Sequence, residues 1–517
     1  MVKYLKLYFI DTLLIILITV PTAYLRLTDL SYSDYIGDEQ KSFIRLAENE
    51  SLYDFFIKQR KGPMQFIVSY GAYKLSGTYR NEAAIRLPYS IISILSVITF
   101  YLLIKKLTKS KTAAFFSALL LSSNGFFVGF GRIAQYQNLN LMFSFLSLYF
   151  AYDLVEKNNK HISSAILAVI FFALSFFSHW DAIFIAPVLV TYFIKFLLRK
   201  DLDRRLKIIV LRNSLVAGAL LILPFMIPYG LYQLKSVANK TYFSRRVTPG
   251  FTDINYFKFL IELYNPYVTL GFISVFAVFG ALRLKKTWIY TLWFLITFFV
   301  FWYFFRKPGT HIYNFLLPAI ILAGLGIDKL VKLFPKFIRF LPILTLLPVF
   351  AFFYYQSYVF FVDHTKEYPW EKKVLYVFPD EFKPKNTRID KFVYYFLSQE
   401  TPKYTAEQKL PLFGFPHNRY WNEINSFVLE QNELNNEKFT YHTNEDKSVS
   451  EWYMNVKFSD KNGFYGVGVN KPTNFVSDWS YTHYGKSRIV VKEFGDEEVK
   501  VKIYRIPPKV SSTSSLQ

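Results

Sequence analysis

Long apolar runs alternate with short polar segments over the first two thirds of the chain. A helix needs about 20 predominantly apolar residues to cross the hydrocarbon core of a bilayer. Eleven segments come close to that requirement, with predicted ranges of 7–25, 88–104, 113–130, 138–155, 162–178, 182–198, 208–230, 267–282, 288–305, 312–327 and 340–361. The pattern therefore predicts a mostly α-helical, polytopic membrane helix bundle.

The last third of the chain follows a different pattern. After "HTKEYPWEKK" the long apolar runs stop, and polar and aromatic residues mix. Stretches such as "SRIVVKEF" and "EVKVKIYRI" alternate apolar and polar positions, which is typical of β-strands. We expect residues 1–362 to form a membrane module and residues 363–507 to form a small α/β or β-rich domain. Residues 508–517 are predicted to be a disordered tail.

Charge along the loops predicts the orientation. Basic loops lie at 105–111, 195–207, 282–286 and 328–339, and all four fall on one side if the spans are counted as above. Short loops rich in Lys and Arg stay in the cytoplasm. The N-terminus is therefore predicted to be cytoplasmic. The long first loop, at 26–87, and the C-terminal domain are predicted to lie on the extracytoplasmic face of a bacterial or archaeal cell membrane.

Composition narrows the class further. The 517 residues are 52% hydrophobic and 20% aromatic, which is rarely seen in soluble chains of this length. The formal net charge of +23 lies mostly in the membrane half, because residues 363–517 carry 22 Lys+Arg against 21 Asp+Glu. We interpret the surplus as a topology signal and exclude nucleic acid as a partner. The chain has no cysteine, so a disulfide or a thiolate metal site is excluded.

Ionisable residues gather at the predicted outer ends of the helices, where such groups are costly unless they are used or paired. They are Asp38, Glu39, Lys61, Arg86, Arg132, His179, Asp181, Arg306, Lys307 and His311. A carboxylate beside several cations suits group transfer, since it can accept the proton of an attacking hydroxyl while the cations hold an anionic leaving group. The sequence has no Walker motif and no G-x-G-x-x-G after a strand, which favours a lipid phosphate over a nucleotide as donor.

A dedicated metal site is not predicted. The seven histidines are scattered, without H-x-x-x-H or H-x-H spacing, which argues against zinc. A divalent metal held by carboxylates stays open. His179 is expected to be a packed or hydrogen-bonded loop residue rather than a ligand.

The short motifs at the predicted outer ends of the helices, which we call the outer-end motifs, follow an order that resembles that in the GT-C superfamily of polyprenyl-phosphate-sugar-dependent glycosyltransferases. It is most similar to the group of protein O-mannosyltransferases and lipid A aminoarabinose transferases. The residues that carry the resemblance are "GDEQ" (37–40), "KGPM" (61–64), "AIRLPYSIIS" (84–93), "GRIAQYQNLNLMF" (131–143), "FFSHWDAIFIAP" (176–187) and "KPGTHIYNFLLP" (307–318). They cover about the first 320 residues in the family's order. The resemblance implies a GT-C fold with its chemistry on the outer face.

Carried over residue by residue, the resemblance makes Asp38 the catalytic aspartate, as general base or acceptor holder, with Glu39 in support. It implies that the donor phosphate is bound by Lys61, Arg86, Arg132, Lys307, His311 and Tyr313. Two positions depart from the family pattern. Gly62 stands where many relatives have proline, and Asn138 stands where many have aspartate, which puts a metal or acceptor role at that position in doubt.

The sequence thus predicts an integral membrane hexosyl- or pentosyltransferase that moves a sugar, with inversion, from a polyprenyl-phosphate donor to a lipid, glycan or protein hydroxyl. No acceptor-binding residue is assigned. Two other classes stay open. A transporter or flippase for lipid-linked glycans would place ionisable or helix-breaking residues near mid-membrane, whereas a scaffold would use its tail to bind partners.

Overall fold

The chain divides into two compact units in the computed structural model. The first unit comprises Met1–Leu30 and Ser42–Pro402, and the second comprises Ser31–Lys41 and Lys403–Gln517. The structure describes residues 2–36, 38–156, 161–247, 267–282, 284–305, 309–364, 418–436, 438–459, 464–469, 489–495 and 501–505. The predicted boundaries of 1–362, 363–507 and 508–517 stay a prediction.

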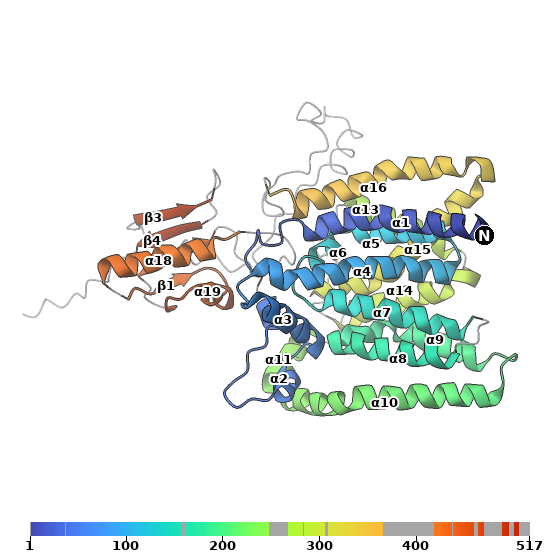
Figure 1. Ribbon diagram of the computed structural model, residues 1–517, viewed down its shortest axis with the longest axis horizontal. Helices are drawn as coiled ribbons and strands as arrows, with labels where there is room; N and C mark the ends of the chain where they lie inside the picture. The colour runs from blue at the N-terminus through green and yellow to red at the C-terminus, as the bar shows by residue number, and fades with distance from the viewer. Residues whose placement is uncertain are drawn as a thin grey trace, which may run out of the picture. The chain divides into compact units, whose positions relative to one another are not determined.

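The described part of the first unit is a helix bundle. Long helices run side by side, and the short helices α2, α3 and α11 gather at one end (Figure 1). The helices are α1 (Val2–Leu27), α2 (Leu52–Lys58), α3 (Pro63–Ser76), α4 (Glu82–Thr108), α5 (Lys111–Ser123), α6 (Gly125–Phe130), α7 (Gln137–Ala151), α8 (His161–Ser178), α9 (Ala186–Leu197), α10 (Arg204–Lys235), α11 (Val237–Arg246), α13 (Tyr267–Ala281), α14 (Leu284–Phe304), α15 (Tyr313–Leu333) and α16 (Phe340–Phe361).

The predicted membrane bundle is confirmed. Each of the eleven predicted segments overlaps a described helix, and seven described helices are long and apolar enough to cross a membrane. Segment 113–130 is not one continuous helix, because Asn124 separates α5 from α6. The Asn124 side chain accepts a hydrogen bond from the Phe126 N–H at 3.0 Å and so begins the second helix. The chain is an integral membrane protein.

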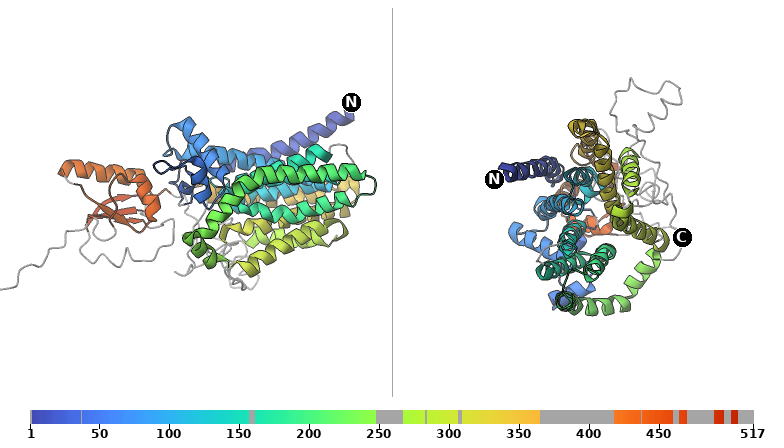
Figure 2. Two further views of the ribbon diagram at one scale, coloured as in Figure 1. Left: turned by 90° about the horizontal axis from the view of Figure 1, so that it is seen from below. Right: turned by 90° about the vertical axis from the view of Figure 1, so that its right-hand side faces the viewer.

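Glycines let helices in the bundle approach closely. A Cβ on Gly280 of α13 would lie 2.0 Å from the Leu322 carbonyl oxygen of α15. A Cβ on Gly326 of α15 would lie 2.0 Å from the Phe276 carbonyl oxygen of α13. Small residues on facing surfaces are typical of helix packing in membranes, where dispersion contacts have to replace the hydrophobic effect. Seen along their axes, the long helices stand next to one another (Figure 2).

The described part of the second unit is a small sheet with two helices, α18 (Trp421–Asn435) and α19 (Lys447–Tyr453). The strands are β1 (Tyr441–Thr443), β2 (Tyr465–Val469), β3 (Ile489–Phe494) and β4 (Val501–Arg505). Their order is β1-β2-β4-β3, with β1 parallel to β2 and the other pairs antiparallel. β3 and β4 confirm the two strands that the alternating sequence pattern predicts.

The segment Ser31–Lys41 of the long first loop belongs to the second unit. The Asp34 carboxylate accepts a hydrogen bond from the Arg419 N–H at 2.8 Å, and the Tyr35 N–H donates to the Tyr453 hydroxyl at 2.7 Å. Residues 385 and 418 positions apart along the chain therefore share one folded unit.

Candidate functional site

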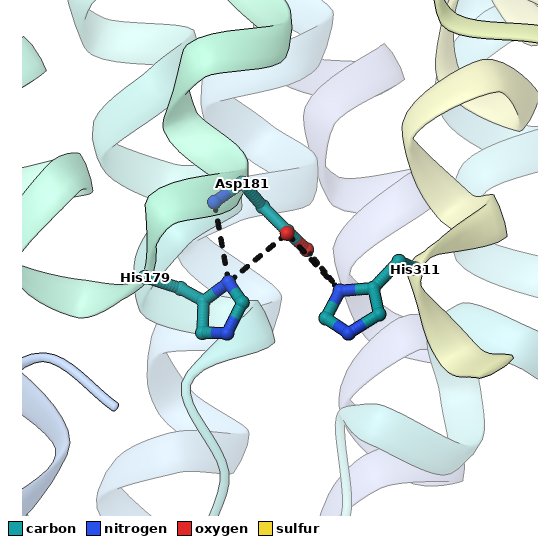
Figure 3. Close-up of side chains that lie close together, drawn as sticks. All are labelled: His179, Asp181 and His311. Atoms are coloured by element: carbon teal, nitrogen blue, oxygen red, sulfur yellow. Dashed lines mark hydrogen bonds and ion pairs between the residues drawn. The ribbon is translucent and has the colours of Figure 1, made fainter. Parts of the chain in front are cut away.

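Three buried side chains converge at the ends of helices in the first unit. The Asp181 carboxylate lies 2.8 Å and 3.0 Å from Nδ1 of His311, and 3.0 Å from Nδ1 of His179. Figure 3 shows that both imidazoles turn Nδ1 toward Asp181. We call His179, Asp181 and His311 the His–Asp–His cluster.

Local backbone structure puts the cluster residues in place. His179 directly follows α8 with extended dihedrals (φ −164°, ψ 151°), which ends that helix. Asp181 lies in the first turn of the 3₁₀ helix Trp180–Ile185, between α8 and α9. His311 lies in the short turn Gly309–Ile312 that leads directly into α15. Two helix ends thus supply the three side chains, and Asp181 and His311 are 130 positions apart in the sequence.

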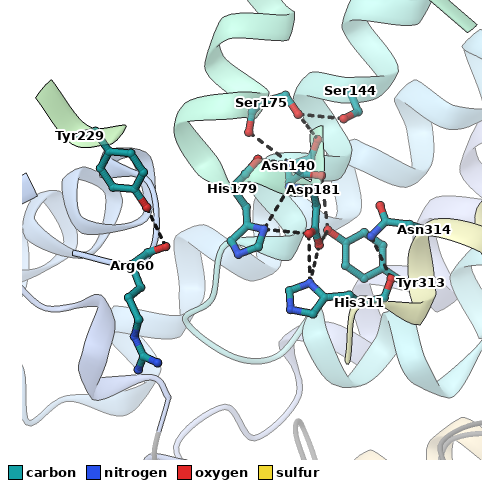
Figure 4. A network of polar contacts seen from close by, with 10 residues as sticks. All are labelled: Arg60, Asn140, Ser144, Ser175, His179, Asp181, Tyr229, His311, Tyr313 and Asn314. Atoms are coloured by element: carbon teal, nitrogen blue, oxygen red, sulfur yellow. Dashed lines mark hydrogen bonds and ion pairs between the residues drawn. The ribbon is translucent and has the colours of Figure 1, made fainter. Parts of the chain in front are cut away.

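Further polar groups hold the cluster. The Tyr313 hydroxyl donates to Asp181 at 2.7 Å, and it lies 3.4 Å from the Asn140 side-chain oxygen (Figure 4). The Asn140 amide donates to the carbonyl oxygens of Ser175 and His179, both at 3.2 Å. Because a buried carboxylate needs several donors, this network from α7, α8 and α15 stabilises the charge of Asp181.

Lys61 joins the cluster through an aromatic ring. Its Nζ lies 5.6 Å from the centroid of the Tyr136 ring, and that ring stacks on His179 with centroids 3.8 Å apart. Gly62 makes this approach possible, since a Cβ there would lie 1.9 Å from the Phe177 carbonyl oxygen near the end of α8. The departure from the family's proline is therefore explained by close packing.

Burial keeps the imidazole of His179 neutral. It lowers the pKa of His179 to about 4, and the charges of His311 and Lys61 act in the same direction against the raising effect of Asp181. His179 is therefore neutral at pH 7. A neutral imidazole has one nitrogen that carries a proton and one with a free lone pair.

The His–Asp–His cluster could hold a divalent cation. Each residue offers one ligand atom, and these atoms lie within 4.8 Å of one another. Nδ1 of His179 lies 3.2 Å from the backbone nitrogen of Asp181, and it must offer a lone pair to accept a hydrogen bond from that N–H. The same Nδ1 lies 3.0 Å from Oδ1 of Asp181, and it must carry a proton to donate to that oxygen. One nitrogen cannot do both at once. A cation bound to its lone pair would replace the proton between the nitrogen and the carboxylate. Two imidazoles and one carboxylate form a ligand set used by zinc and other transition metals.

Comparison with known proteins places the bundle in a fold class. Residues 60–232 match the family model described as dolichyl-phosphate-mannose-protein mannosyltransferase. An uncharacterised protein of Aquifex aeolicus (strain VF5) is 26% identical over 287 residues, which are 52% of this chain and 55% of that protein. The chain thus spans about half the length of this curated relative.

The solved structures of ArnT from Cupriavidus metallidurans align over nearly the whole chain. The form bound to undecaprenyl phosphate gives a TM-score of 0.53 at 12% identity, over 99% of both chains. The apo form gives 0.50 at 12% identity, over 97% of this chain and 98% of that one. The chain has the GT-C fold. The resemblance that the outer-end motifs indicate is therefore confirmed.

Within this GT-C bundle, the structure brings together three of the predicted phosphate-binding residues, Lys61, His311 and Tyr313. Their role in binding the donor stays a prediction. The sequence does not single out Asp181 and His179 as functional, because the cluster forms only when two distant helix ends meet. The short polar turn "SHWDA" between two apolar spans places both among the ionisable residues at outer helix ends, but it does not show that they meet His311.

Arg86 and Arg132 lie buried where α1 ends. Arg132 donates to the carbonyl oxygens of Leu25 at 2.6 Å and Thr28 at 2.7 Å, and Arg86 donates to that of Leu30 at 2.7 Å. Cations are favourable at the carboxyl end of a helix, where carbonyl groups lack partners. Burial, together with the charge of Arg86, lowers the pKa of Arg132 to about 9. A donor-binding role of both arginines stays a prediction, and Lys307 lies outside the described residues.

Asp38 and Glu39 lie in the second unit. The Asp38 side chain is 31% exposed and pairs with the ammonium of Lys41 at 2.8 Å. Glu39 is fully buried, and its carboxylate accepts the Ile36 N–H at 2.9 Å. Asp38 thus has the exposure that a reacting carboxylate requires, whereas Glu39 holds a turn. Their catalytic roles stay predictions.

Proposed function

We propose that this protein is a glycosyltransferase that moves a sugar from a polyprenyl-phosphate carrier to an acceptor hydroxyl on the outer face of the membrane. One observation carries the proposal. Lys61 and the His–Asp–His cluster lie together at helix ends of a GT-C bundle, and the same fold occurs in a protein solved with undecaprenyl phosphate. A cation beside a buried polar cluster suits the head group of a lipid phosphate.

In the proposed reaction, the bond between the anomeric carbon and the phosphate oxygen breaks, and the lipid phosphate leaves with the electron pair. The Lys61 ammonium stabilises the negative charge that develops on that oxygen. Asp181 and Tyr313 fix the orientation of His311 beside it. A divalent cation held by the cluster would supply further positive charge for the same purpose. Arg86, Arg132 and Lys307 are additional donor-site residues on the family resemblance alone.

Asp38 is proposed to act on the acceptor. Its carboxylate takes the proton of the attacking hydroxyl, whose oxygen forms a bond to the anomeric carbon on the face opposite the phosphate. This displacement inverts the configuration of the sugar. The acceptor is a hydroxyl of a lipid, glycan or protein, and the sugar is a hexose or a pentose.

A transfer assay tests the proposal. Purified protein in liposomes receives labelled polyprenyl-phosphate sugars and a total membrane extract. Wild type should label an acceptor, whereas Lys61→Met and Asp38→Asn should each lower the rate at least about 100-fold, because a charge that acts in the transition state is lost. Lys74→Met is the matched control, since Lys74 is exposed on α3 and lies over Tyr70 rather than near the cluster.

Two results would contradict the proposal. Equal transfer by wild type and Asp38→Asn would remove Asp38 from the reaction. Movement of the labelled lipid across the bilayer, without transfer of the sugar, would favour a flippase for lipid-linked glycans.

A further inference from the structure

The segment Ser31–Lys41 interrupts the first unit along the chain. On one side of it, the Leu30 carbonyl accepts a hydrogen bond from Arg86 at 2.7 Å. On the other side, the Ser42 hydroxyl accepts one from Ser69 at 3.1 Å. The chain is thus held in the first unit immediately before and after the segment, while the segment itself packs into the second unit.

One attachment of the segment runs through Asp34 to Arg419, two residues before the start of α18. The Asp34 carboxylate accepts the backbone N–H of Arg419 at 2.8 Å. The Arg419 guanidinium pairs with the Glu445 carboxylate at 3.1 Å, and all three residues are buried. A buried ion pair is costly to disturb, because removal of one partner leaves an uncompensated charge. Arg419 therefore holds the side chain of Asp34 in the second unit.

A second attachment joins Tyr35 to the end of α19. The Tyr35 N–H donates to the Tyr453 hydroxyl at 2.7 Å, and the two rings stack with centroids 6.4 Å apart. Trp452 packs edge-on against the same Tyr35 ring, with centroids 6.3 Å apart. Tyr35 is 0% and Tyr453 1% exposed, so water does not replace this hydrogen bond when it is lost.

Glu39 then closes a tight turn around Asp38. The Glu39 N–H donates to the Ile36 carbonyl at 2.7 Å, and the Glu39 carboxylate accepts the Ile36 N–H at 2.9 Å. This reciprocal pair fixes both ends of the turn. Asp38 is left between them with a partly exposed side chain, paired with Lys41. The direction of the Asp38 carboxylate therefore depends on Ile36, whose neighbour Tyr35 is bound to Tyr453.

From these contacts we infer that the second unit is a positioning element for catalysis, in which Tyr453 and Arg419 hold the loop that presents Asp38. The inference rests on the proposed function of Asp38 as general base. Tyr453 acts through the backbone N–H of Tyr35 and Arg419 through the side chain of Asp34, so both are positioning residues. They touch no reacting atom in this scheme, so their loss should affect the rate of the chemical step rather than the binding of the donor.

The test compares Tyr453→Phe with Tyr441→Phe in the full-length protein. Both changes remove one buried hydroxyl from the second unit, but the Tyr441 hydroxyl makes no hydrogen bond to the described part of the segment. Hydrogen exchange of the peptide that covers residues 31–41 should rise at least about tenfold in Tyr453→Phe and stay unchanged in Tyr441→Phe. Tyr453→Phe should also lower kcat about tenfold, with an unchanged KM for the labelled polyprenyl-phosphate sugar.

A double-mutant cycle separates positioning from general damage. Tyr453→Phe should lower kcat in the wild-type background and leave the residual rate of Asp38→Asn unchanged, because both changes act on one group. An equal loss in the two backgrounds would overturn the inference. The inference would also be overturned if Tyr453→Phe changed neither the hydrogen exchange of the segment nor the rate of transfer while Asp38→Asn was inactive. That result would leave the proposed function intact. Transfer by Asp38→Asn at the wild-type rate would overturn the catalytic role of Asp38 in the proposed function and in this inference. Hydrogen exchange of residues 31–41 would still report whether Tyr453 holds the segment.

Discussion

Asp181 is the centre of the candidate site at the scale of single residues. Its buried carboxylate accepts hydrogen bonds from Tyr313 and from the imidazole of His311, and it lies beside the imidazole of His179. Tyr313 and His311 lie at the start of α15, whereas His179 follows α8. The loss of any one partner leaves part of the buried carboxylate without a donor.

Tyr313→Phe should therefore destabilise the protein by about 1–3 kcal/mol, the usual cost of an unsatisfied buried group. We expect the rate of sugar transfer to fall as well, since the orientation of His311 depends on Asp181. Thermal unfolding in detergent and the transfer assay measure the two effects. Tyr355→Phe is the control, because Tyr355 is 44% exposed on α16. Equal stability and equal transfer rates in Tyr313→Phe and Tyr355→Phe would contradict the stabilising role of the hydrogen bond from Tyr313 to Asp181.

Metal binding gives a second prediction for the cluster. Protein incubated with Zn²⁺ or Mn²⁺ and then dialysed should retain about one equivalent of metal by mass spectrometry, and His311→Ala should lose it, because three ligands are reduced to two. His161→Ala should retain the metal, since His161 is a buried histidine on α8 that packs against Phe196 outside the cluster. Retention by His311→Ala would show that metal binds elsewhere.

The sequence predicts that cations lie at helix ends, but it cannot distinguish those near the candidate site from those that bind the end of a helix. Lys61 and Arg132 are both cations at helix ends, yet Lys61 lies by the cluster whereas Arg132 bonds to carbonyl oxygens of α1 and the residue after it. Binding a phosphate and binding a helix end call for the same side-chain chemistry. Only the three-dimensional position distinguishes them, so the pattern predicts where cations gather and not which of them reach a ligand.

At the scale of elements, a glycine determines how the loop before α3 meets the end of α8. Gly62 packs on the carbonyl of Phe177, two positions before His179, and it directly follows Lys61. A side chain at position 62 would push this loop away from α8. The distance between Lys61 and the His–Asp–His cluster is therefore controlled by the absence of one methyl group.

Gly62→Ala should raise the KM for the lipid donor about tenfold, because Lys61 is displaced from the phosphate site. The matched control is Gly71→Ala in α3, where a Cβ would meet no atom within 4 Å. That change should stabilise the helix slightly, since alanine is a better helix former than glycine. The transfer assay at varied donor concentration separates the two variants, and an unchanged KM in Gly62→Ala would contradict this account.

The contact between α13 and α15 gives a stability prediction. Gly326→Ala should cost about 1–3 kcal/mol, because its Cβ would overlap the Phe276 carbonyl and force the helices apart. Gly230→Ala in α10, where nothing lies within 4 Å, should not destabilise the protein. Thermal unfolding in detergent measures both, and a Gly326→Ala protein as stable as wild type would show that the two helices can separate freely.

Helices are also the features that the sequence predicts best, because an apolar run of about 20 residues has few structural alternatives. The break at Asn124 is the exception. A single polar residue inside an apolar run changes hydrophobicity little, yet its side chain caps a new helix. Hydropathy alone does not detect a cap.

At the scale of the whole molecule, the chain does not divide at one point. The sequence predicts 26–87 as one loop of the membrane module, because composition changes only near residue 363. The structure assigns Ser31–Lys41 to the same unit as residues beyond 403. No local pattern reveals a contact such as that between Tyr35 and Tyr453, which are 418 positions apart.

That contact has a consequence for biosynthesis. A ribosome adds about 5–20 residues per second, so roughly 20–80 s separate the synthesis of Tyr35 from that of Tyr453. During that interval, the helices can insert into the membrane while the segment around Asp38 still lacks its attachments. If Asp38 acts as proposed, an unfinished or truncated chain would insert normally and bind the proposed lipid donor but would not transfer the sugar. Under the proposed role of Asp38, the late synthesis of the C-terminal unit would delay sugar transfer until translation is nearly complete.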